Sequence, residues 1–383
     1  MKGKHTSLRT YLPALLYREW LRAKLRRQVR WEPLADAQPG CTAIIGVCSR
    51  LPQALLANLR SLHSARWPEL KEVIAVVDGR EGALPRSMEQ QVHSMYGELN
   101  LKFLHYSDAQ SRVAEKLQLP YVYSWMSWCI GIGHTRTRQL LLHDYDALIL
   151  GRSLAERYRS FVESKAKVQG ITWYHVNGLE ETDRLATTFE AFFDTEWLRS
   201  LEPIELFNKL GIRHGRSIDF DTTLDAQDRL LSPGERTIAA MPLTELVHPS
   251  QMIHQYTMFR RRPNAAQPCF SMPMIPFFAY LSGTESAIGR ATSVLEGGAR
   301  ERLDMFGDGT WINLSLLTVE NVDWSLKQMI QALLALRIEP DPAIHRYGTA
   351  LYRAVGAAEN QVWRGDFTDA QREWIERSAA VPA

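Results

Sequence analysis

Two aspartates stand two positions apart directly after an apolar segment in the middle of the chain. Residues 139–143 read QLLLH, and Asp144, Tyr145 and Asp146 follow. At the end of a buried strand, residues i and i+2 point to the same side of the pleat. Two carboxylates in that arrangement can hold a divalent cation, and the cation can neutralise a diphosphate. The motif therefore indicates either an enzyme for nucleotide-linked substrates or two solvated acids at a strand-to-loop corner.

Polar residues also follow two earlier apolar segments. Ser49 and Arg50 come after residues 42–48, and Asp78 ends residues 71–78. Continuous apolar segments of this length predict strands that are buried on both faces, as in a parallel sheet. In open parallel sheets, ligands bind outside the carboxyl ends of the strands. We therefore expect these three residues to share one crevice with the aspartate pair.

The elements that must position these residues alternate between strands and helices. The predicted strands are 42–48, 71–78, 101–106, 139–144 and 170–176. The predicted helices are 51–64, 85–98, a short one from Asp108, and 188–201 as either a helix or an aromatic-rich loop. Alternation of this kind predicts an α/β fold with a mostly parallel sheet flanked by helices. Helical patterns at about 324–337, 342–355 and 368–379 predict a C-terminal helical extension.

The order TAIIGVCSR, KEVIAVVDG and Asp-x-Asp resembles the nucleotide-sugar-binding half of GT-A-fold glycosyltransferases of the family-2 type, over roughly residues 41–260. The resemblance implies a donor site that includes Ser49, Arg50 and Asp144, with Asp78 contacting the nucleotide base. It also implies that Asp144 and Asp146 hold Mn²⁺ or Mg²⁺ on the diphosphate of the donor. One departure is Gly79, where many relatives have a second acid. Another is the stretch WCIGIGHTRTR, which stands where relatives have a longer helix before the metal strand.

The glycine-spaced stretch GIGHTR, residues 131–136, has an alternative interpretation. It resembles the phosphate-binding loop of sugar-phosphate nucleotidyltransferases, but that loop should follow the first strand of the sheet. We therefore predict a turn near the donor site. Arg136 at its end either contacts the donor phosphates or is a solvent-facing charge.

Three aspartates precede a predicted helix after residue 218. Inverting transferases of the family that this chain resembles keep a carboxylate in this region to deprotonate the acceptor hydroxyl. The family pattern, an acid followed three residues later by Leu, selects Asp221, with Asp219 and Asp225 as alternates. The structural alternative is that an aspartate caps the helix.

A histidine follows the short apolar segment ELV at residues 245–247. His248 resembles the third metal ligand of many GT-A enzymes, and imidazole is an acceptable ligand for manganese. The competing candidate is His254, which the sequence places inside a helix. Either histidine can instead be held by ordinary hydrogen bonds.

Aromatic residues gather at 173–175 and 189–197. They form either an acceptor platform, because aromatic faces stack on sugar rings, or part of the core. Glu190 and Asp194 lie among them and are candidates for hydrogen bonds to acceptor hydroxyls.

The composition is that of an ordinary globular protein, with 383 residues, 45% hydrophobic residues and a net charge of +2. Nothing in it indicates a nucleic-acid partner. The four cysteines have no metal-ligand spacing, which indicates a reducing compartment, and we expect the cytoplasm. No apolar segment approaches the roughly 18 residues of a membrane span, and charges interrupt the N-terminal apolar residues, so we expect no signal peptide.

The first thirty residues carry many Lys and Arg residues and one acid, Glu19. Residues 7–31 predict an amphipathic helix, whose apolar side consists of Leu8, Leu12, Leu15, Leu16 and Trp20. Such a helix either lies on an anionic membrane surface, peripherally on the inner face, or packs on its own domain with a solvated basic face. We expect three parts: the basic arm 1–40, the catalytic domain 41–262, and the linker and helical extension 263–383.

The function expected from the resemblance is metal-dependent transfer of a sugar from a nucleotide-diphosphate donor to a hydroxyl of a glycan or lipid. Asp144, Asp146 and His248 would bind the metal, and Asp221 would activate the acceptor. A sugar-phosphate nucleotidyltransferase is one alternative, although it needs a glycine-rich loop near residue 50. A non-catalytic binding or scaffold protein with the same fold is the other.

Overall fold

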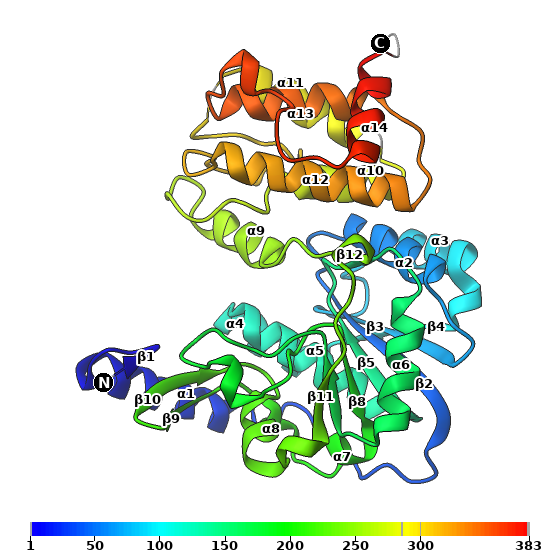
Figure 1. Ribbon diagram of the computed structural model, residues 1–383. Coiled ribbons are helices and arrows are strands. Elements are labelled where there is room, and N and C mark those ends of the chain that lie inside the picture. Colours follow the sequence, from blue (N-terminus) through cyan, green and yellow to red (C-terminus); the bar gives the residue numbers. More distant parts are fainter. Residues whose placement is uncertain (1, 285, 299, 381–383) are drawn as a thin grey trace. The chain divides into compact units, whose positions relative to one another are not determined.

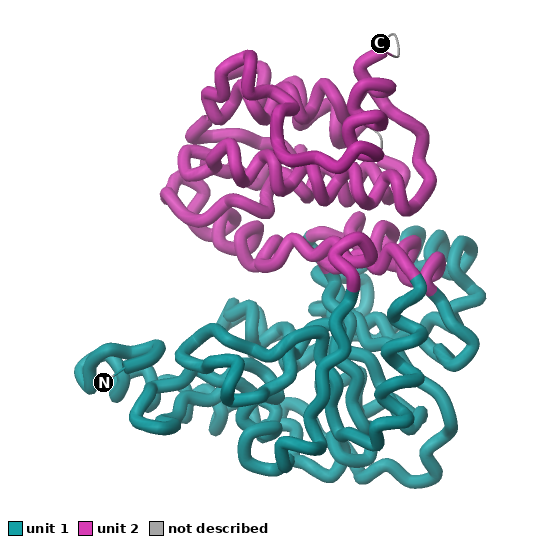
Figure 2. The backbone as a smooth tube through the Cα atoms, viewed as in Figure 1, with its two compact units in different colours: residues 1–50, 66–145, 152–241 teal, residues 51–65, 146–151, 242–383 magenta. Residues whose placement is uncertain are grey.

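A computed structural model describes residues 2–284, 286–298 and 300–380. The chain divides into two compact units (Figure 2). The first comprises residues 1–50, 66–145 and 152–241, and we call it the sheet unit. The second comprises residues 51–65, 146–151 and 242–383, and we call it the helical unit. That 1–40, 41–262 and 263–383 are separate domains stays a prediction.

A seven-stranded sheet forms the centre of the sheet unit (Figure 1). Its strand order is β11-β7-β8-β5-β2-β3-β4. The strands are β2 (Gln38–Val47), β3 (Leu70–Val77), β4 (Leu101–His105), β5 (Thr137–His143), β7 (Val168–Gly170), β8 (Ala191–Asp194) and β11 (Arg236–Ile238). The run β5-β2-β3-β4 is parallel, whereas β8 is antiparallel to both β5 and β7. The predicted α/β class with a mostly parallel sheet is therefore confirmed.

Helices connect and flank these strands. They are α1 (Leu8–Leu25), α3 (Arg86–Tyr96), α4 (Asp108–Leu117), α5 (Pro120–His134), α6 (Ser153–Ser164), α7 (Thr195–Arg199) and α8 (Leu224–Leu230). Local capping explains where two of them begin: Ser7 caps α1, and Ser107 forms a capping box with Gln110 at α4. The predicted basic N-terminal helix is confirmed, although it ends at Leu25 rather than at residue 31.

The region before β5 differs from the prediction. The sequence predicted a short stretch and a glycine turn, but residues 120–134 form the 15-residue helix α5. Gly131 lies inside this helix and faces β2, because a Cβ atom there would lie 2.4 Å from Ile44 Cγ2. The glycine thus allows close packing of the helix on the sheet and is not part of a phosphate loop.

Two further predictions are corrected. The strand predicted at 170–176 ends at Gly170 as β7, and residues 188–201 contain strand β8 and the short helix α7 rather than one helix or loop. Phe192 and Phe193 are fully buried on the two faces of β8. A strand buried on both faces has no period-2 alternation, so its sequence cannot be told from that of a buried helix.

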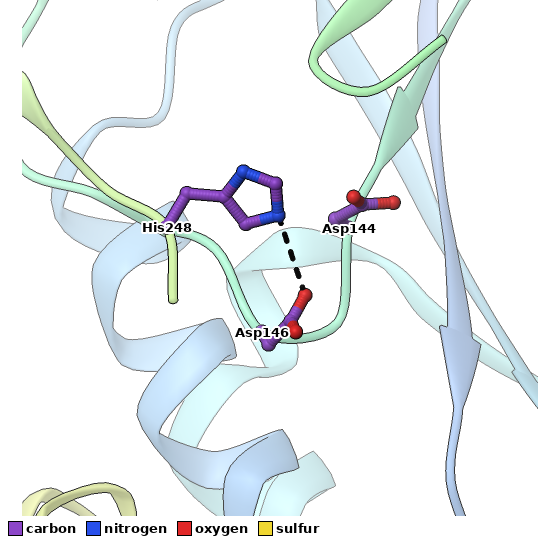
Figure 3. Close-up of side chains that lie close together, drawn as sticks. All are labelled: Asp144, Asp146 and His248. Carbon is purple, nitrogen blue, oxygen red and sulfur yellow. Dashed lines mark ion pairs between the residues drawn. The ribbon is translucent and has the colours of Figure 1, made fainter. Parts of the chain in front are cut away.

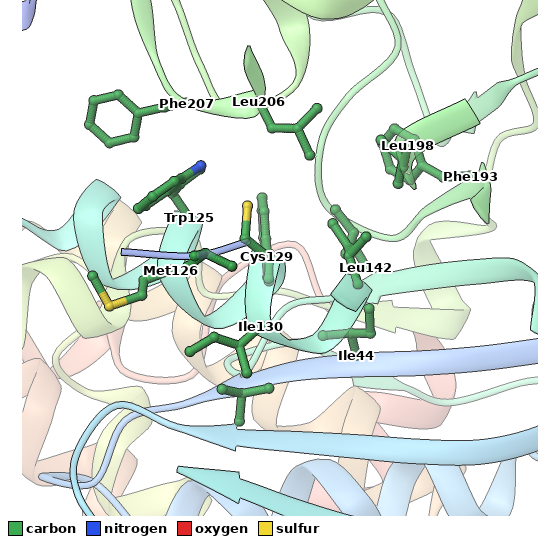
Figure 4. Close-up of a cluster of buried hydrophobic side chains, with 14 of the residues drawn as sticks. Ile44, Trp125, Met126, Cys129, Ile130, Leu142, Phe193, Leu198, Leu206 and Phe207 are labelled. Carbon is green, nitrogen blue, oxygen red and sulfur yellow. The ribbon is translucent and has the colours of Figure 1, made fainter. Parts of the chain in front are cut away.

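The core of the sheet unit lies between α5 and the sheet (Figure 4). Trp125, Met126 and Cys129 of α5 and Ile44 of β2 are all buried in it. Each large apolar side chain buried in this way stabilises the fold by roughly 1.5–3 kcal/mol relative to an exposed one. The core thereby holds β2 and β5 in place, and the candidate site residues follow these two strands.

A second, three-stranded sheet has the order β1-β10-β9. β9 (Lys209–Arg213) and β10 (Arg216–Phe220) form an antiparallel hairpin, and β1 (Lys2–Gly3) pairs in parallel with β10. His214 and Gly215 at the tip both have positive φ, as a two-residue hairpin of the primed type requires. The hairpin presents the acidic segment that follows β10, and α1 packs against β9.

The helical unit contains seven α-helices in its described residues. They are α2 (Gln53–Ser64), α9 (Met252–Arg261), α10 (Met274–Leu281), α11 (Ser286–Glu296), α12 (Val319–Ala335), α13 (Pro342–Ala354) and α14 (Asp369–Ala380). A two-stranded sheet joins β6 (Leu148–Ile149) to β12 (Leu246–Val247). The predicted C-terminal helices are confirmed as α12, α13 and α14. No helix in the described part of the chain combines the length and the apolar character needed to cross a bilayer.

Candidate functional site

A cavity of about 730 Å³ lies at the carboxyl ends of β2, β3 and β4. Three of the predicted donor-binding residues, Ser49, Arg50 and Asp78, line it together. Its other lining residues are Gly79, Arg80, Glu81, Gly82, Ala83, Tyr106, Ser107, Asp108, Glu115 and Tyr123. Parallel pairing of β2 with β3 and of β3 with β4 brings these strand ends to one edge, as the sequence predicted. Asp144 and Asp146, which we expected in the same crevice, are not among the residues that line this cavity.

Asp78 organises the polar side of this cavity. Its Oδ1 accepts a hydrogen bond of 2.8 Å from the backbone N–H of Ser49. Burial raises the pKa of Asp78, while hydrogen bonds from Ser49 and the charge of Arg50 oppose that rise. The carboxylate therefore ties the loop after β2 to the end of β3, and it places a hydrogen-bond acceptor in the cavity.

Two tyrosines form an aromatic wall of the same cavity. The rings of Tyr106 and Tyr123 are stacked, with centroids 6.5 Å apart and an interplanar angle of 16°. The Tyr106 hydroxyl bonds to Ser127 Oγ at 2.8 Å, which fixes its ring against α5. Neither tyrosine is among the residues that the sequence analysis predicts for the site. Tyr106 ends the predicted strand 101–106, so the rule that selected Asp78 would also have selected it.

Asp144, Asp146 and His248 lie close together (Figure 3). One ligand atom from each residue lies within 4.8 Å of the other two, and the distance from His248 Nε2 to Asp146 Oδ1 is 3.6 Å. Antiparallel pairing of Val247 with Leu148 brings His248 toward Asp146. His248, rather than His254, is thus the histidine beside the aspartates.

Buried side chains of α2 hold the loop that carries Asp146. Asn58 Nδ2 donates to the carbonyl oxygen of Ala147 at 3.0 Å, and Ser61 Oγ accepts from the N–H of Ile149 at 3.1 Å. Both side chains are fully buried. Because their bonds go to the backbone on the C-terminal side of Asp146, they fix the direction in which the chain leaves the motif.

Glu190 fixes the chain at Asp144. Its Oε1 lies 2.7 Å from His143 Nδ1 and accepts a bond of 3.2 Å from the N–H of Asp144. Arg157 also donates to the Glu190 carbonyl oxygen at 2.9 Å. Glu190 is fully buried, so the prediction that it binds acceptor hydroxyls is wrong. The carboxylate of Asp194 is also engaged in hydrogen bonds, which Lys167 and the N–H of Trp197 donate to it.

The three grouped side chains fit a divalent cation. Two carboxylates supply the hard oxygen ligands that Mg²⁺ and Mn²⁺ prefer, and a neutral imidazole adds a nitrogen that favours Mn²⁺. Ligands on adjacent positions of an octahedral ion lie about 3 Å apart, which is close to the 3.6 Å between His248 and Asp146. The residues can therefore converge on one ion with small side-chain movements.

Asp221 follows β10 and precedes α8. Its Oδ1 accepts bonds of 2.8 Å from both Asn208 Nδ2 and the N–H of Thr222. Burial raises the pKa of Asp221 in spite of these two bonds. A carboxylate with a raised pKa is a better proton acceptor, which is the property that a general base needs.

The two alternate acids near Asp221 are neutralised by cations. Asp219 accepts both guanidinium N–H groups of Arg18, at 3.0 and 3.3 Å. Asp225 binds Lys209 at 3.1 Å and Arg229 at 2.8 Å. Both carboxylates are engaged in ion pairs that connect segments of this region. Asp221 is therefore the better candidate for the base among the three.

Arg136 lies at the other end of β5 from Asp144. It is exposed and directly precedes β5, whereas Asp144 directly follows that strand. The extended chain of β5 runs between them, and the steps from residue 136 to residue 144, at roughly 3.3 Å each, separate the two by roughly 26 Å. The glycine stretch forms the end of helix α5 and leads to the amino edge of the sheet rather than to the edge where Asp144 lies.

Some of the aromatic residues that were candidates for an acceptor platform are buried. Phe192 and Phe193 are fully buried, and Phe193 stacks on Trp197 with centroids 6.4 Å apart. The rings of Phe192 and Phe193 belong to the core and cannot form an acceptor platform. Trp173 is half-buried and lies under the guanidinium of Arg184.

Comparisons with known proteins give structural similarities of low score. No protein-family model and no curated protein matches the sequence. The chain is similar to the mannosyltransferase PcManGT of Pyrobaculum calidifontis in complex with GDP-Man and Mn²⁺, at 13% identity over 97% of this chain and 93% of that one, with a TM-score of 0.33. It is also similar to the galactosyltransferase LgtC in complex with donor and acceptor sugar analogues, at 10% identity over 64% of this chain and 95% of that one, with a TM-score of 0.41.

A third similar structure is S. aureus TarS 1–349 in complex with UDP-GlcNAc, at 14% identity over 86% of this chain and 95% of that one, with a TM-score of 0.31. TM-scores below 0.5 and identities below 25% do not assign an activity. The function is therefore argued from the side chains of this protein.

Proposed function

We propose that this protein is a metal-dependent glycosyltransferase that uses a nucleotide-diphosphate sugar as donor. The observation that carries the proposal is the group of Asp144, Asp146 and His248 at the carboxyl end of β5. β5 pairs with β2, and β2 ends at the cavity lined by Ser49 and Asp78. A cation site and a cavity with an aromatic wall at one sheet edge are what a nucleoside diphosphate requires.

Each part of the donor matches a feature of the site. The half-buried ring of Tyr123, backed by the buried ring of Tyr106, would offer an aromatic surface to a nucleobase, and Asp78 would accept a hydrogen bond from it. Arg50 supplies a positive charge for the phosphates. A divalent cation held by Asp144, Asp146 and His248 would stabilise the charge of the departing diphosphate.

Asp221 is proposed as the base that activates the acceptor. Its carboxylate takes the proton of a hydroxyl on a glycan or lipid, and the hydroxyl oxygen forms a bond to the anomeric carbon. The bond between that carbon and the diphosphate oxygen breaks in the same step, so the configuration is inverted. Because Oδ1 already accepts two hydrogen bonds, Oδ2 is the oxygen that takes the proton.

The nucleotidyltransferase alternative shares the parallel sheet and the metal-binding acids, but it needs a glycine-rich loop near residue 50, which this sequence lacks. The glycine stretch at 131–136 does not supply that loop, because Gly131 and Gly133 belong to helix α5. The alternative of a non-catalytic scaffold is separated from the proposal by experiment.

A thermal-shift series with UDP, GDP, CDP, ADP and dTDP, each with and without Mn²⁺, tests the proposal. We expect stabilisation by one nucleotide class that requires the metal and disappears in Asp144→Asn. Asp366→Asn, at an exposed acid of the helical unit, is the matched control and should respond like the wild type. No shift with any nucleotide in folded, metal-supplied protein would favour the scaffold.

A further inference from the structure

Helix α1 exposes a row of large apolar residues on the side opposite to the one that packs on the sheet unit. The exposed fractions are 60% for Leu8, 49% for Leu12, 70% for Leu16 and 50% for Trp20. These four residues, which we call the apolar stripe, are spaced four positions apart and therefore lie on successive turns of one side. Tyr17 is also exposed beside them and stacks on Trp20 with centroids 5.7 Å apart. Single exposed apolar residues are common, but a continuous stripe marks an interaction surface.

The opposite side of α1 attaches the helix to the sheet unit. Tyr11, Leu21 and Leu25 are buried there. Arg18 on the same side forms the bidentate bond to Asp219, and Arg22 donates to the carbonyl oxygen of Phe207 at 3.0 Å. The stripe is therefore exposed on a helix that is already fully docked, and the domain has no need of it for its own packing.

Cations accompany the stripe on the exposed side. At 100° per residue, Arg9 and Lys24 fall within the same half of the helix as Leu16, and Glu19 is the acid among them. Arg27 lies in the turn that follows the helix. Arg9 and Arg27 are exposed. The Lys24 ammonium lies 4.9 Å from the centroid of the Trp20 ring, at the end of the stripe. Leucines with an interfacial aromatic pair and flanking cations are the composition of a helix that lies in a lipid headgroup layer.

We infer that α1 binds the surface of an anionic lipid bilayer, with the apolar stripe inserted below the headgroups and Arg9, Lys24 and Arg27 on lipid phosphates. Charge complementarity favours an anionic bilayer over a second copy of the chain as the partner of this surface. A second copy of the chain would bring the same cations against one another, whereas anionic lipids neutralise them and accept the leucines. The surface goes beyond the proposed transfer reaction and does not depend on it.

Vesicle co-sedimentation of the full chain, without nucleotide or metal, tests this inference. We expect the wild type to bind vesicles of phosphatidylcholine mixed with phosphatidylglycerol and to be released by salt. Leu16→Ser should weaken binding about tenfold, because it removes one inserted leucine. Arg9→Gln and Arg27→Gln should each weaken binding about fivefold, in line with the contribution of one basic residue near an anionic surface.

Val162→Ser is the matched control, because Val162 is an exposed aliphatic residue on α6 of the same unit. It should bind vesicles like the wild type, and all variants should keep the wild-type thermal midpoint. Absence of binding by the wild type at low salt, or wild-type binding by Leu16→Ser, would overturn the inference. So would a concentration-dependent dimer in sedimentation velocity that Leu16→Ser abolishes, since the stripe would then be covered by a second copy.

Discussion

Two groups of acidic side chains in this protein differ in what surrounds them. Asp144 and Asp146 lie close to each other and to the imidazole of His248. Asp219 and Asp225 lie on either side of Asp221, but each is bound by Arg or Lys side chains. In the first group the acids converge on one point, and in the second group each flanking acid has its own cation.

The difference separates binding acids from structural acids. Carboxylates that converge repel one another, and this repulsion is relieved when a cation binds between them. Carboxylates with guanidinium partners have no such tendency and instead connect segments of the chain, as Asp219 connects β10 to α1. Asp221 belongs to neither class, since amide donors bind it and burial raises its pKa.

The largest effect is expected at the converging acids. Asp146→Asn should lower the transfer rate by about 10³-fold or more, because one hard ligand of the cation is lost. Initial rates at saturating donor over a Mn²⁺ titration measure this loss. Asp366→Asn should keep the wild-type rate, and a wild-type rate in Asp146→Asn would contradict the metal assignment.

Asp221→Asn should lower kcat by about 10²–10⁴-fold and leave donor binding unchanged, since a general base acts only in the chemical step. Single-turnover rates and nucleotide thermal shifts measure the two effects. Asp219→Asn is the contrast: it should reduce the free energy of unfolding by about 1–3 kcal/mol through loss of the Arg18 pair, with little effect on chemistry. Unchanged kcat in Asp221→Asn would point to a retaining mechanism.

The raised pKa of Asp221 also predicts a pH dependence with a definite sign. The rate should fall as the pH falls through that raised pKa, because the base becomes protonated. The contribution of Asp221 to folding stability has the opposite pH dependence. The folded state holds the proton more tightly than the unfolded state, so this contribution is lost as the pH rises from the unfolded pKa through the folded one. Asp221→Asn should remove both dependences in pH–rate profiles and pH-dependent melting.

Glu190→Gln should weaken metal binding by about tenfold, because it disturbs the residue that fixes the chain at His143 and Asp144. A Mn²⁺ titration followed by thermal shift measures this change. Glu163→Gln, at an exposed acid of α6, serves as the control and should bind Mn²⁺ like the wild type. Equal Mn²⁺ affinity in both variants would show that Glu190 has only a packing role.

The smallest expected effect tests α5 as a packing helix. Gly131→Ala should reduce the free energy of unfolding by about 1–3 kcal/mol, because its Cβ would meet Ile44 of β2. At Gly133 a Cβ would lie 3.7 Å from Trp31, an ordinary contact, so Gly133→Ala should be neutral or stabilising. Urea unfolding of the two variants compares them. Equal stabilities would contradict the close approach of α5 to the sheet.

The sequence was informative where one local rule decided the outcome. The apolar runs before Asp78 and Asp144 predicted the parallel strands β3 and β5 and the edge at which polar residues gather. It was misleading where a residue has two uses. A glycine such as Gly131 occurs both in phosphate-binding loops and in helices that pack closely on a sheet. The apolar residues of α1 likewise form the same sequence pattern whether that side of the helix is buried or exposed.

Local sequence by itself therefore determined the class of the fold, the strand ends at the cavity, and the Asp-x-Asp spacing, because periodicity and chain direction act over a few residues. Only the tertiary structure decided that His248 rather than His254 meets Asp146, that Arg18 and Lys209 neutralise Asp219 and Asp225, and that the leucines of α1 face outward. Each of these outcomes depends on contacts between segments far apart in the chain, and neither spacing nor propensity encodes which distant side chains meet.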